Sequence, residues 1–511
     1  MVRCDKSHAM KLARVLLTIL PLLGVCACSG GGGSTTQAPV AVWEKFRHDA
    51  SNSGQGSGAI ATNNGSIKWH AQIDQSPISS SPALDINGTI YVATEGGTLA
   101  ALRPADGSIL WKVCGCDAPG SGTPLTCPPG TPAPGTPSSL GALISSPAVY
   151  SVSSVINIFI GSANGSVYMF QDNGTTRTCA ARFQPKETDF GSGATIVSRF
   201  NSSPAFTTNP GTMAVAGIFI GAAVDVTQSG ATRTVGKLYA INTDGTVMWQ
   251  FPGVGAGEIG AVTSSPALNC GSASIDLSHC VATALYFTAA DGNLYGLSDD
   301  GTFKWRFPIG VGTDPSAPFS ASPLLSNLIF VPSASGHIFA INPDGSFRLR
   351  VTSPDGTGFV SSLAVGNPAT TTPTITPTVP PTPAPPPGAT MTPTATATPA
   401  LPTTTIFGVT TSGTVVLIDA TTGVSSVLSL AEAIAGPVVS SPLLSADSYL
   451  VVGAADGKLH AINTFTGEQP SSAWPVQLTD GMPIRSSPSV DNNGVIYVGA
   501  DDGMVYAVGT Q

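Results

Sequence analysis

Runs of alternating apolar and polar residues, separated by turns that contain glycine, recur along most of this chain. The stretch from Ser80 to Val113, SSPALDINGTIYVATEGGTLAALRPADGSILWKV, has such runs after its opening Ser-Ser-Pro. Period-2 alternation is typical of half-buried strands. Asp-Gly or Asn-Gly between two runs is typical of hairpins, because glycine accepts the positive φ of a tight turn. The pattern therefore predicts antiparallel strands, and beyond the N-terminal segment no sustained helical period competes with it.

The same order of segments returns eight times, which is the signature of a repeat protein. Each copy opens with small residues and continues with a run such as TIYVAT, a turn, and a second run such as KLYAIN. Most copies add a last run that often holds tryptophan. We expect each copy to form four antiparallel strands, A to D. After Ser80, the openings stand at Ser145, Ser202, Ser264, Ser320 (SASP), Ser361 (SSLAV), Ser440 and Ser486.

Eight four-stranded units can pack in few ways. One small sheet cannot bury both of its faces, so neighbours must stack, and radial stacking about an axis gives a β-propeller. We expect an all-β fold, a single eight-bladed β-propeller of four-stranded antiparallel blades. Strand A would be innermost, where only small side chains fit, which accounts for the Ser-Ser-Pro openings. The alternative is that the serine hydroxyls line a binding channel.

The ring is expected to close with a strand from the N-terminal side. The eighth copy reaches Gln511 after its third strand, whereas GSIKWHAQI, ahead of the first copy, is a spare fourth strand. Residues 66–73 should therefore complete the last blade. The tryptophans of the outermost strands should pack between blades, away from the axis; they are Trp69, Trp111, Trp249, Trp305 and Trp474.

One segment interrupts the repeats. Residues 367–405 are almost wholly Pro, Thr and Ala, without charge or aromatic side chains. Such a composition cannot bury a core and favours disordered, extended conformations. The segment falls between strands A and B of the sixth blade. We expect it to share one face of the ring with the loop between Cys270 and Cys280, and the segments ahead of each strand A to lie on the other face.

The N-terminal region resembles that of an exported lipoprotein. Two basic residues precede VLLTILPLLGV, an apolar run of signal-peptide length. The following VCAC resembles a lipobox with Cys28 as the lipidated residue; Cys26 is a poorer candidate because valine precedes it. Ser29 suggests the outer membrane, and the alternative is a plain secreted protein. The expected organisation is a signal peptide over 1–27, a flexible Gly/Ser tether over 28–42 and the propeller over 43–511.

Six cysteines follow the lipobox, an even number that favours disulfides in an exported protein. Cys270 and Cys280 lie in one A–B insertion and are the first pair expected. We expect Cys127 to pair with one of its two nearest cysteines and Cys179 with the other. Zinc is a weak alternative for this group, since no histidine lies near it in sequence. The remaining four cysteines are Cys114, Cys116, Cys127 and Cys179.

Charged residues make up only 10% of the chain, and the formal net charge is −9. Many acidic residues stand in the Asp-Gly turns, where they shape the backbone. No basic patch is visible, which argues against nucleic acid as a partner. We expect a monomer that contacts other envelope proteins and reaches the membrane only through a lipid anchor.

With the repeats laid out, the chain resembles the PQQ-binding-like β-propeller repeat family. WEKFRHDASNSG, from Trp43 onward, resembles the usual lead-in of that family, and LYAINTDGTVMW resembles its tryptophan-docking hairpin. The resemblance covers nearly everything after Trp43. It implies one of two kinds of protein: quinoprotein dehydrogenases, in which pyrroloquinoline quinone and Ca²⁺ sit on the axis, or non-enzymatic lipoproteins of the BamB type.

The residues with which quinoprotein dehydrogenases hold their cofactor are not recognisable in this sequence. Those enzymes carry a vicinal disulfide against the quinone, and no two adjacent cysteines occur here. They also need clustered carboxylate and amide oxygens for Ca²⁺, with an Asp base beside the ion. The charged residues just ahead of strand A, which should reach the mouth of the axis, are the candidate ligand or partner residues. They are scattered over different blades: Asp74, Arg199, Glu258, Asp314, Glu432 and Arg485.

We therefore expect a non-enzymatic, membrane-anchored propeller that serves as a scaffold or binding platform at the cell envelope and holds no cofactor. No haem attachment motif, Walker loop or Ser/His/Asp signature appears in the sequence. Two alternatives stay open: a PQQ-dependent dehydrogenase, and a surface propeller that binds carbohydrate or protein.

Overall fold

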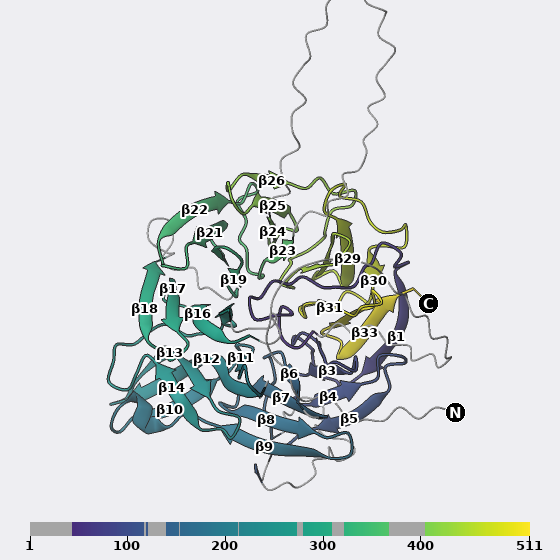
Figure 1. The fold of residues 1–511 in the computed structure, drawn as a ribbon. Coiled ribbons are helices and arrows are strands. Elements are labelled where there is room, and N and C mark those ends of the chain that lie inside the picture. Colours follow the sequence, from purple (N-terminus) through teal and green to yellow (C-terminus); the bar gives the residue numbers. More distant parts are fainter. Residues whose placement is uncertain are drawn as a thin grey trace, which may run out of the picture. The chain divides into compact units, whose positions relative to one another are not determined.

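Eight antiparallel sheets stand in a ring around a common axis, so the predicted eight-bladed β-propeller is confirmed (Figure 1). No helix among the described residues is long and apolar enough to cross a membrane. The computed structural model describes residues 43–116, 119–120, 139–152, 154–212, 214–272, 280–308, 321–366 and 404–510.

In blades 1 to 7 the chain runs from the inner strand A to the outer strand D, and in blade 8 it runs from strand A to strand C. Blades 1 to 4 consist of β2 (Ala83–Leu84), β3 (Ile90–Ala93), β4 (Leu99–Leu102), β5 (Ile109–Val113); β6 (Ala148–Val152), β7 (Val155–Gly161), β8 (Val167–Asp172), β9 (Arg177–Phe183); β11 (Ala205–Thr208), β12 (Val215–Gln228), β13 (Ala231–Ile241), β14 (Val247–Phe251); and β15 (Ala267–Cys270), β16 (Ala282–Thr288), β17 (Asn293–Ser298), β18 (Phe303–Pro308).

Blades 5 to 8 follow the same plan. They consist of β19 (Leu324–Leu325), β20 (Ile329–Pro332), β21 (His337–Ile341), β22 (Phe347–Thr352); β23 (Ala364–Gly366), β24 (Thr405–Val409), β25 (Val415–Asp419), β26 (Ser425–Val427); β27 (Leu443–Leu444), β28 (Tyr449–Gly453), β29 (Lys458–Asn463), β30 (Val476–Gln477); and β31 (Ser489–Val490), β32 (Ile496–Gly499), β33 (Met504–Gly509), β1 (Ser66–Gln72). We name the face with the D–A connections and B–C turns the top face, and the face with the A–B and C–D turns the bottom face.

The last blade is completed by the N-terminal strand, as the sequence predicts. β1 pairs antiparallel with β33, with Ser66 opposite Gly509 and Gln72 opposite Met504. Without this strand, β33 would present a row of unpaired backbone groups at the edge of its sheet. The pairing of the two ends of the propeller therefore closes the ring.

Blade 3 departs from the four-strand plan. β12 and β13 are 14 and 11 residues long, and β10 (Thr195–Arg199) pairs with the far end of β12. The blade therefore has a fifth strand, and its B–C hairpin extends beyond the repeat on the top face. The repeat pattern predicted only GIFIGA and KLYAIN as strands here, and the added length lies between them.

The apolar core lies at the seams between blades. One cluster joins residues of β19 to β22 with residues of β23 to β25, and further clusters join the other neighbouring blades in the same way. The largest cluster spans blades 7, 8 and 1 and includes Trp69 and Trp474. Burial of both faces of each blade explains why its middle strands are apolar at nearly every position.

Two disulfides are seen among the described residues. Cys270 bonds to Cys280 across the A–B insertion of blade 4, which is the first pair predicted. Cys116 bonds to Cys179, so the connection between blades 1 and 2 is tied to β9. Cys114 is also oxidised in a disulfide, whereas Cys127 lies outside the described residues.

The Pro/Thr-rich segment enters and leaves the sheet of blade 6 at its A–B connection. β23 ends at Gly366 and β24 begins at Thr405, so Thr405, the last residue of the predicted disordered segment, belongs to the sheet. Residues 367–403 lie outside the described residues, as do the predicted signal peptide, Cys28 and the tether.

Candidate functional site

A closed ring of serine hydroxyls surrounds the axis. In every blade the second residue of the opening triplet is serine, and its backbone N–H donates to the Oγ of the matching serine in the next blade, at 2.8–3.2 Å. All eight residues are 3–6% exposed. The members, in ring order, are Ser81, Ser146, Ser203, Ser265, Ser322, Ser362, Ser441 and Ser487.

This ring refines the sequence interpretation of the triplets. The small size of serine explains only part of its presence near the axis. Each hydroxyl also accepts a hydrogen bond from a backbone N–H of the neighbouring blade, which the short strand A leaves unpaired. Blade 5 replaces the first serine with Ala321 and blade 6 replaces proline with Leu363, yet both keep the second serine. The alternative, that these hydroxyls line a binding channel, is wrong for the second serines, which are buried and joined to one another.

The segment ahead of the closing strand, residues 43–58, winds around the bottom end of the axis (Figure 1, dark purple). We call it the lead-in. In six blades its backbone carbonyls accept hydrogen bonds from one repeated position of strand A, two residues after the proline position of the opening. The donors are the N–H groups of Leu84, Val149, Leu268, Leu325, Val365 and Leu444, at 2.6–3.0 Å. The lead-in thus supplies strand A with hydrogen-bond partners on the side where no further strand fits.

Charged side chains of the lead-in are buried on the axis. The Arg47 guanidinium is 2% exposed and donates to the carbonyls of Leu363 and Pro442, in blades 6 and 7. Lys45 Nζ donates to Asn52 Oδ1 at 2.7 Å. Asp49 accepts hydrogen bonds from the backbone and hydroxyl groups of Ser51 and Ser53. The polar groups of the lead-in are therefore largely satisfied by one another and by the blades.

The pKa values of these groups follow from their burial. Burial lowers the pKa of Lys45 to about 7, although the charge of Asp49 opposes the shift. Burial acts to raise the pKa of Asp49, but the imidazole of His48, 3.6 Å away, and the hydrogen bonds from Ser53 hold that pKa below its usual value. The lead-in is thus a charged network built into the core of the ring.

Three residues of the lead-in adopt left-handed backbone conformations that non-glycine residues rarely populate: Arg47, His48 and Asn52, with φ of 63°, 76° and 58°. The Asn52 side chain donates to the carbonyls of Ser265 and Pro323, in blades 4 and 5. These contacts stabilise the tight turns by which the segment follows the ring. In the sequence this stretch resembles a family lead-in, but no local pattern indicates that its charged residues are buried.

The bottom mouth of the ring is a cleft of about 850 Å³ around the lead-in. The ends of strand A in blades 4 and 6 line it, with Cys270 on one side and Gly366 and Thr404 on the other. The disulfide loop and the ends of the Pro/Thr-rich segment therefore share the bottom face, as the topology predicts. Gln55 and Ser57 are the exposed residues of the lead-in at this mouth.

The candidate residues of the top face fall into separate groups. At the seam of blades 8 and 1, Arg485 contacts Asp501 at 2.8 Å and Glu95 at 2.9 Å. Asp74 lies close by, because its carboxylate accepts a hydrogen bond from Thr94, the residue before Glu95, at 2.7 Å. The structure thus brings Asp74 and Arg485 to one seam.

Arg199 and Glu258 lie elsewhere, at the extended hairpin of blade 3. Arg199 forms a bidentate pair with Asp225 of β12, at 2.7 and 3.1 Å. Glu258 forms a bidentate pair with Arg233 of β13, with contacts of 2.6–2.9 Å. Both candidates therefore hold the hairpin in place instead of converging on the axis.

The remaining two candidate residues belong to neither of these groups. Glu432 faces Lys458 at 3.7 Å, near blade 7. Asp314 lies outside the described residues. Each of the five candidates that the structure describes is thus engaged by a partner in its own part of the face, and their role toward a ligand or partner stays a prediction.

The described residues do not fit pyrroloquinoline quinone with Ca²⁺ on the axis. Calcium needs several oxygen ligands at one place. Within the described ranges no group of three or more His, Cys, Asp and Glu side chains is placed to hold a metal ion. Trp43, the tryptophan nearest the lead-in's charged network, is 2% exposed and packs against His48, with ring centroids 4.9 Å apart. The other five tryptophans lie in strands D or directly before β30, at the seams.

Comparison with protein families matches residues 55–127 and 386–511 to the family described as "Outer membrane protein assembly factor BamB". These segments include blade 1, most of blade 6, and blades 7 and 8. No curated protein sequence matches the chain significantly.

Solved structures of similar fold include both kinds of protein. BamB from Moraxella catarrhalis is 14% identical, with a TM-score of 0.51 over 87% of this chain and 98% of that one. The quinohemoprotein alcohol dehydrogenase from Comamonas testosteroni is 12% identical, with a TM-score of 0.56 over 92% and 81%. The designed protein Ika8 is 15% identical, with a TM-score of 0.52 over 87% and 100%. At such identities the likeness concerns the fold alone. The family match over these two segments and the likeness of the eight-bladed fold to these structures support a PQQ-like β-propeller repeat family.

Proposed function

We propose that this protein is a non-enzymatic binding platform of the cell envelope, similar in role to lipoproteins of the BamB type. The observation that carries the proposal is the lead-in, which fills the bottom end of the axis and bonds six of the eight inner strands. An axis committed to the protein's own core leaves the two faces, with their loops, as the surfaces available to partners.

The platform is proposed to be anchored to the outer membrane by a lipid on Cys28. The lipobox-like VCAC, the apolar run before it and Ser29 after it support this position. Residues 29–42, rich in Gly, Ser and Thr, would let the propeller move relative to the membrane surface. A rigid disc on such a tether can present either face to other envelope proteins.

The top face offers the most distinctive surface for a partner. The extended hairpin of β12 and β13 is specific to blade 3 among the described blades, and the pairs Arg199–Asp225 and Arg233–Glu258 brace it. Val197, on the adjoining β10, is 61% exposed. A braced hairpin with exposed apolar and charged side chains is a suitable recognition element.

Affinity purification of the full chain from detergent-solubilised outer membranes tests the proposal. Envelope proteins should co-purify in stoichiometric amounts and should be captured reciprocally when the partner carries the tag. A Cys28→Ala variant should leave the membrane fraction but still bind the purified partner. Absence of any stoichiometric partner, together with quinone-dependent dye reduction by the purified protein, would favour the dehydrogenase instead.

A further inference from the structure

The seams between blades share a tryptophan contact. Five seams have a docked tryptophan in or directly before strand D. In four of them the indole N–H donates, at 2.9–3.1 Å, to a backbone carbonyl of the segment that leads into strand D of the next blade. The pairs are Trp69 with Pro104, Trp249 with Asp299, Trp305 with Pro343 and Trp474 with Asn63. A glycine of that segment lies directly against each ring: Gly107, Gly301, Gly345 and Gly65.

The seam between blades 1 and 2 departs from this arrangement. Trp111 donates to a carboxylate, Asp172 Oδ2, at 2.7 Å. Gly174, in the C–D turn of blade 2, has no atom within 4 Å of the position its Cβ would take, whereas that position at Gly107 lies 2.4 Å from Trp69. The turn of blade 2 is therefore not packed over the indole, and the Arg177 guanidinium lies 5.8 Å from its ring centre instead.

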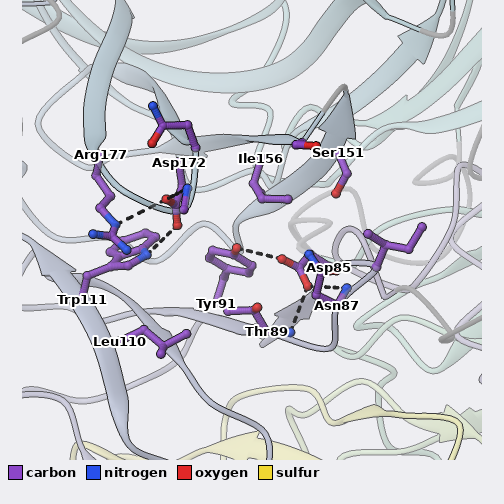
Figure 2. A pocket seen from close by; sticks show the side chains of 14 residues that line it. Asp85, Asn87, Thr89, Tyr91, Leu110, Trp111, Ser151, Ile156, Asp172 and Arg177 are labelled. Atoms are coloured by element: carbon purple, nitrogen blue, oxygen red, sulfur yellow. Dashed lines mark hydrogen bonds and ion pairs between the residues drawn. The ribbon is translucent and has the colours of Figure 1, made fainter.

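The looser packing leaves a cleft of about 610 Å³ on the bottom face, away from the axis. Figure 2 shows Asp172 and Arg177 at one end of it, Asp85 and Asn87 at the other, and Tyr91 between them. Ile86 and Leu110, on its apolar wall, are 52% and 41% exposed. Its volume lies within the range of small-ligand sites, and its lining mixes apolar walls with a few converging polar groups.

The two carboxylates of the cleft are rigidly held. Asp85 accepts hydrogen bonds from the N–H groups of Asn87 and Thr89 and from the Tyr91 hydroxyl, at 2.8–3.0 Å. Asp172 accepts from the N–H of Gly174 at 2.8 Å as well as from Trp111. A carboxylate has about four acceptor positions, so each keeps at least one for a ligand donor.

The charge of the cleft narrows the class of ligand. Burial raises the pKa of Asp85, and hydrogen bonds from Thr89, Tyr91 and Asn87 only partly oppose this shift, so a further donor would stabilise the buried carboxylate. Arg177 offers donors beside Asp172, since its Nε faces that carboxylate at 3.4 Å and has no hydrogen bond in the structure. Two carboxylates disfavour an anion, the guanidinium disfavours a simple cation, and the polar ends disfavour an apolar molecule.

We propose that this cleft binds an uncharged, hydroxyl-rich ligand, namely the sugar residues of a glycan. Ligand hydroxyls donate to Asp85 and Asp172 and accept from Arg177, and the C–H face of the sugar packs on Ile86 and Leu110. The proposal concerns a second surface, independent of any protein partner on the top face.

Binding of the full chain to an array of neutral glucose, galactose and N-acetylglucosamine oligosaccharides tests this proposal, with spermidine and Ca²⁺ as cationic probes. Leu110→Trp, which fills the cleft, and Asp172→Asn, which removes one charge, are each expected to weaken binding about tenfold or more. Met248→Trp is the matched control, because Met248 precedes Trp249 as Leu110 precedes Trp111 and is 47% exposed. It should bind like the wild type.

The outcomes separate clearly, provided that all variants melt within a few degrees of the wild type. Selective binding of a neutral oligosaccharide that Leu110→Trp abolishes and Met248→Trp preserves supports the proposal. Binding of none of these sugars overturns it, as does binding that is equal in both tryptophan variants. Preferential, Asp172-dependent binding of spermidine or Ca²⁺ also overturns it, because the cleft is then a cation site.

Discussion

The backbone N–H of Ser487, in the last blade, donates to Oγ of Ser81, in the first blade, across 406 residues of sequence at 3.2 Å. This bond closes the serine ring, just as the pairing of β1 with β33 closes the outer rim. The propeller is thus joined end to end at both its inner and outer radius. The stability of each blade should consequently depend on its neighbours.

Replacing one member of the serine ring should destabilise the whole propeller. In Ser322→Ala the N–H of Ser265 loses its acceptor in a buried place, which costs about 1–3 kcal/mol of the free energy of unfolding. Ser57→Ala is the control, because Ser57 bonds Asn492 at the exposed surface and should change stability by about 0.5 kcal/mol or less. Urea denaturation followed by circular dichroism measures both. Equal stability of the two variants would show that the ring contributes only by the small size of serine.

Deleting the lead-in should weaken a propeller that is still closed. A chain that starts at residue 58 keeps β1, but the strand A donors of six blades lose the carbonyls that accept from them. A chain that starts at residue 74 also loses β1 and exposes the edge of β33. The melting temperature should therefore fall from the chain that starts at residue 43 to those that start at residues 58 and 74. Gel filtration should show that the shortest chain aggregates. If the shortest chain melts like the longest, neither the lead-in nor β1 supports the ring.

Stability should depend on pH through Lys45. The folded chain releases this proton near pH 7, whereas the unfolded chain keeps it to about 10.5. The unfolded state therefore binds more protons between these values, and the free energy of unfolding rises with pH by up to about 1.4 kcal/mol per unit. Denaturation at pH 7, 8 and 9 measures the slope, below the range where tyrosines titrate. Lys45→Met should remove this part of the slope; an unchanged slope would mean that Lys45 stays charged in the folded protein.

The two disulfides should differ in their contribution to stability. Cys270–Cys280 closes a separation of 10 residues and Cys116–Cys179 one of 63. In the chain-entropy model, replacing each pair with serines costs about 3 and about 4 kcal/mol. Urea denaturation of the two double variants gives the comparison. A larger loss for the Cys270/Cys280 variant would mean that local packing around the A–B insertion outweighs loop entropy.

Much of the fold is visible in the sequence because it repeats. The Asp-Gly turns, the alternating runs and the spare strand with Trp69 fix the number of blades and the closure, and each depends on local chemistry. The seam position of Trp69 follows as well, because the same hairpin returns from blade to blade. The pairing of Cys270 with Cys280 is local in the same sense.

The parts that the sequence does not reveal depend on contacts between distant residues. Arg47 bonds carbonyls 316 and 395 residues away, and no local pattern indicates such partners. Arg199 and Glu258 were predicted at the axial mouth because they precede strand A, but the extended hairpin of blade 3 provides closer partners. The cleft at Trp111 forms because the C–D turn of blade 2 does not pack over the indole, unlike the glycine-bearing segments at the other tryptophan seams. This difference is visible only when the seams are compared.

Retention of pyrroloquinoline quinone by the purified protein tests the central claim, that the axis is structural core and that function lies on the faces. The chain from Trp43 onward is incubated with Ca²⁺ and excess quinone, passed through gel filtration and assayed by absorbance for quinone per chain. The account predicts that no quinone is retained and that alcohols and sugars reduce no artificial acceptor. One quinone per chain, together with substrate-dependent dye reduction, would contradict it.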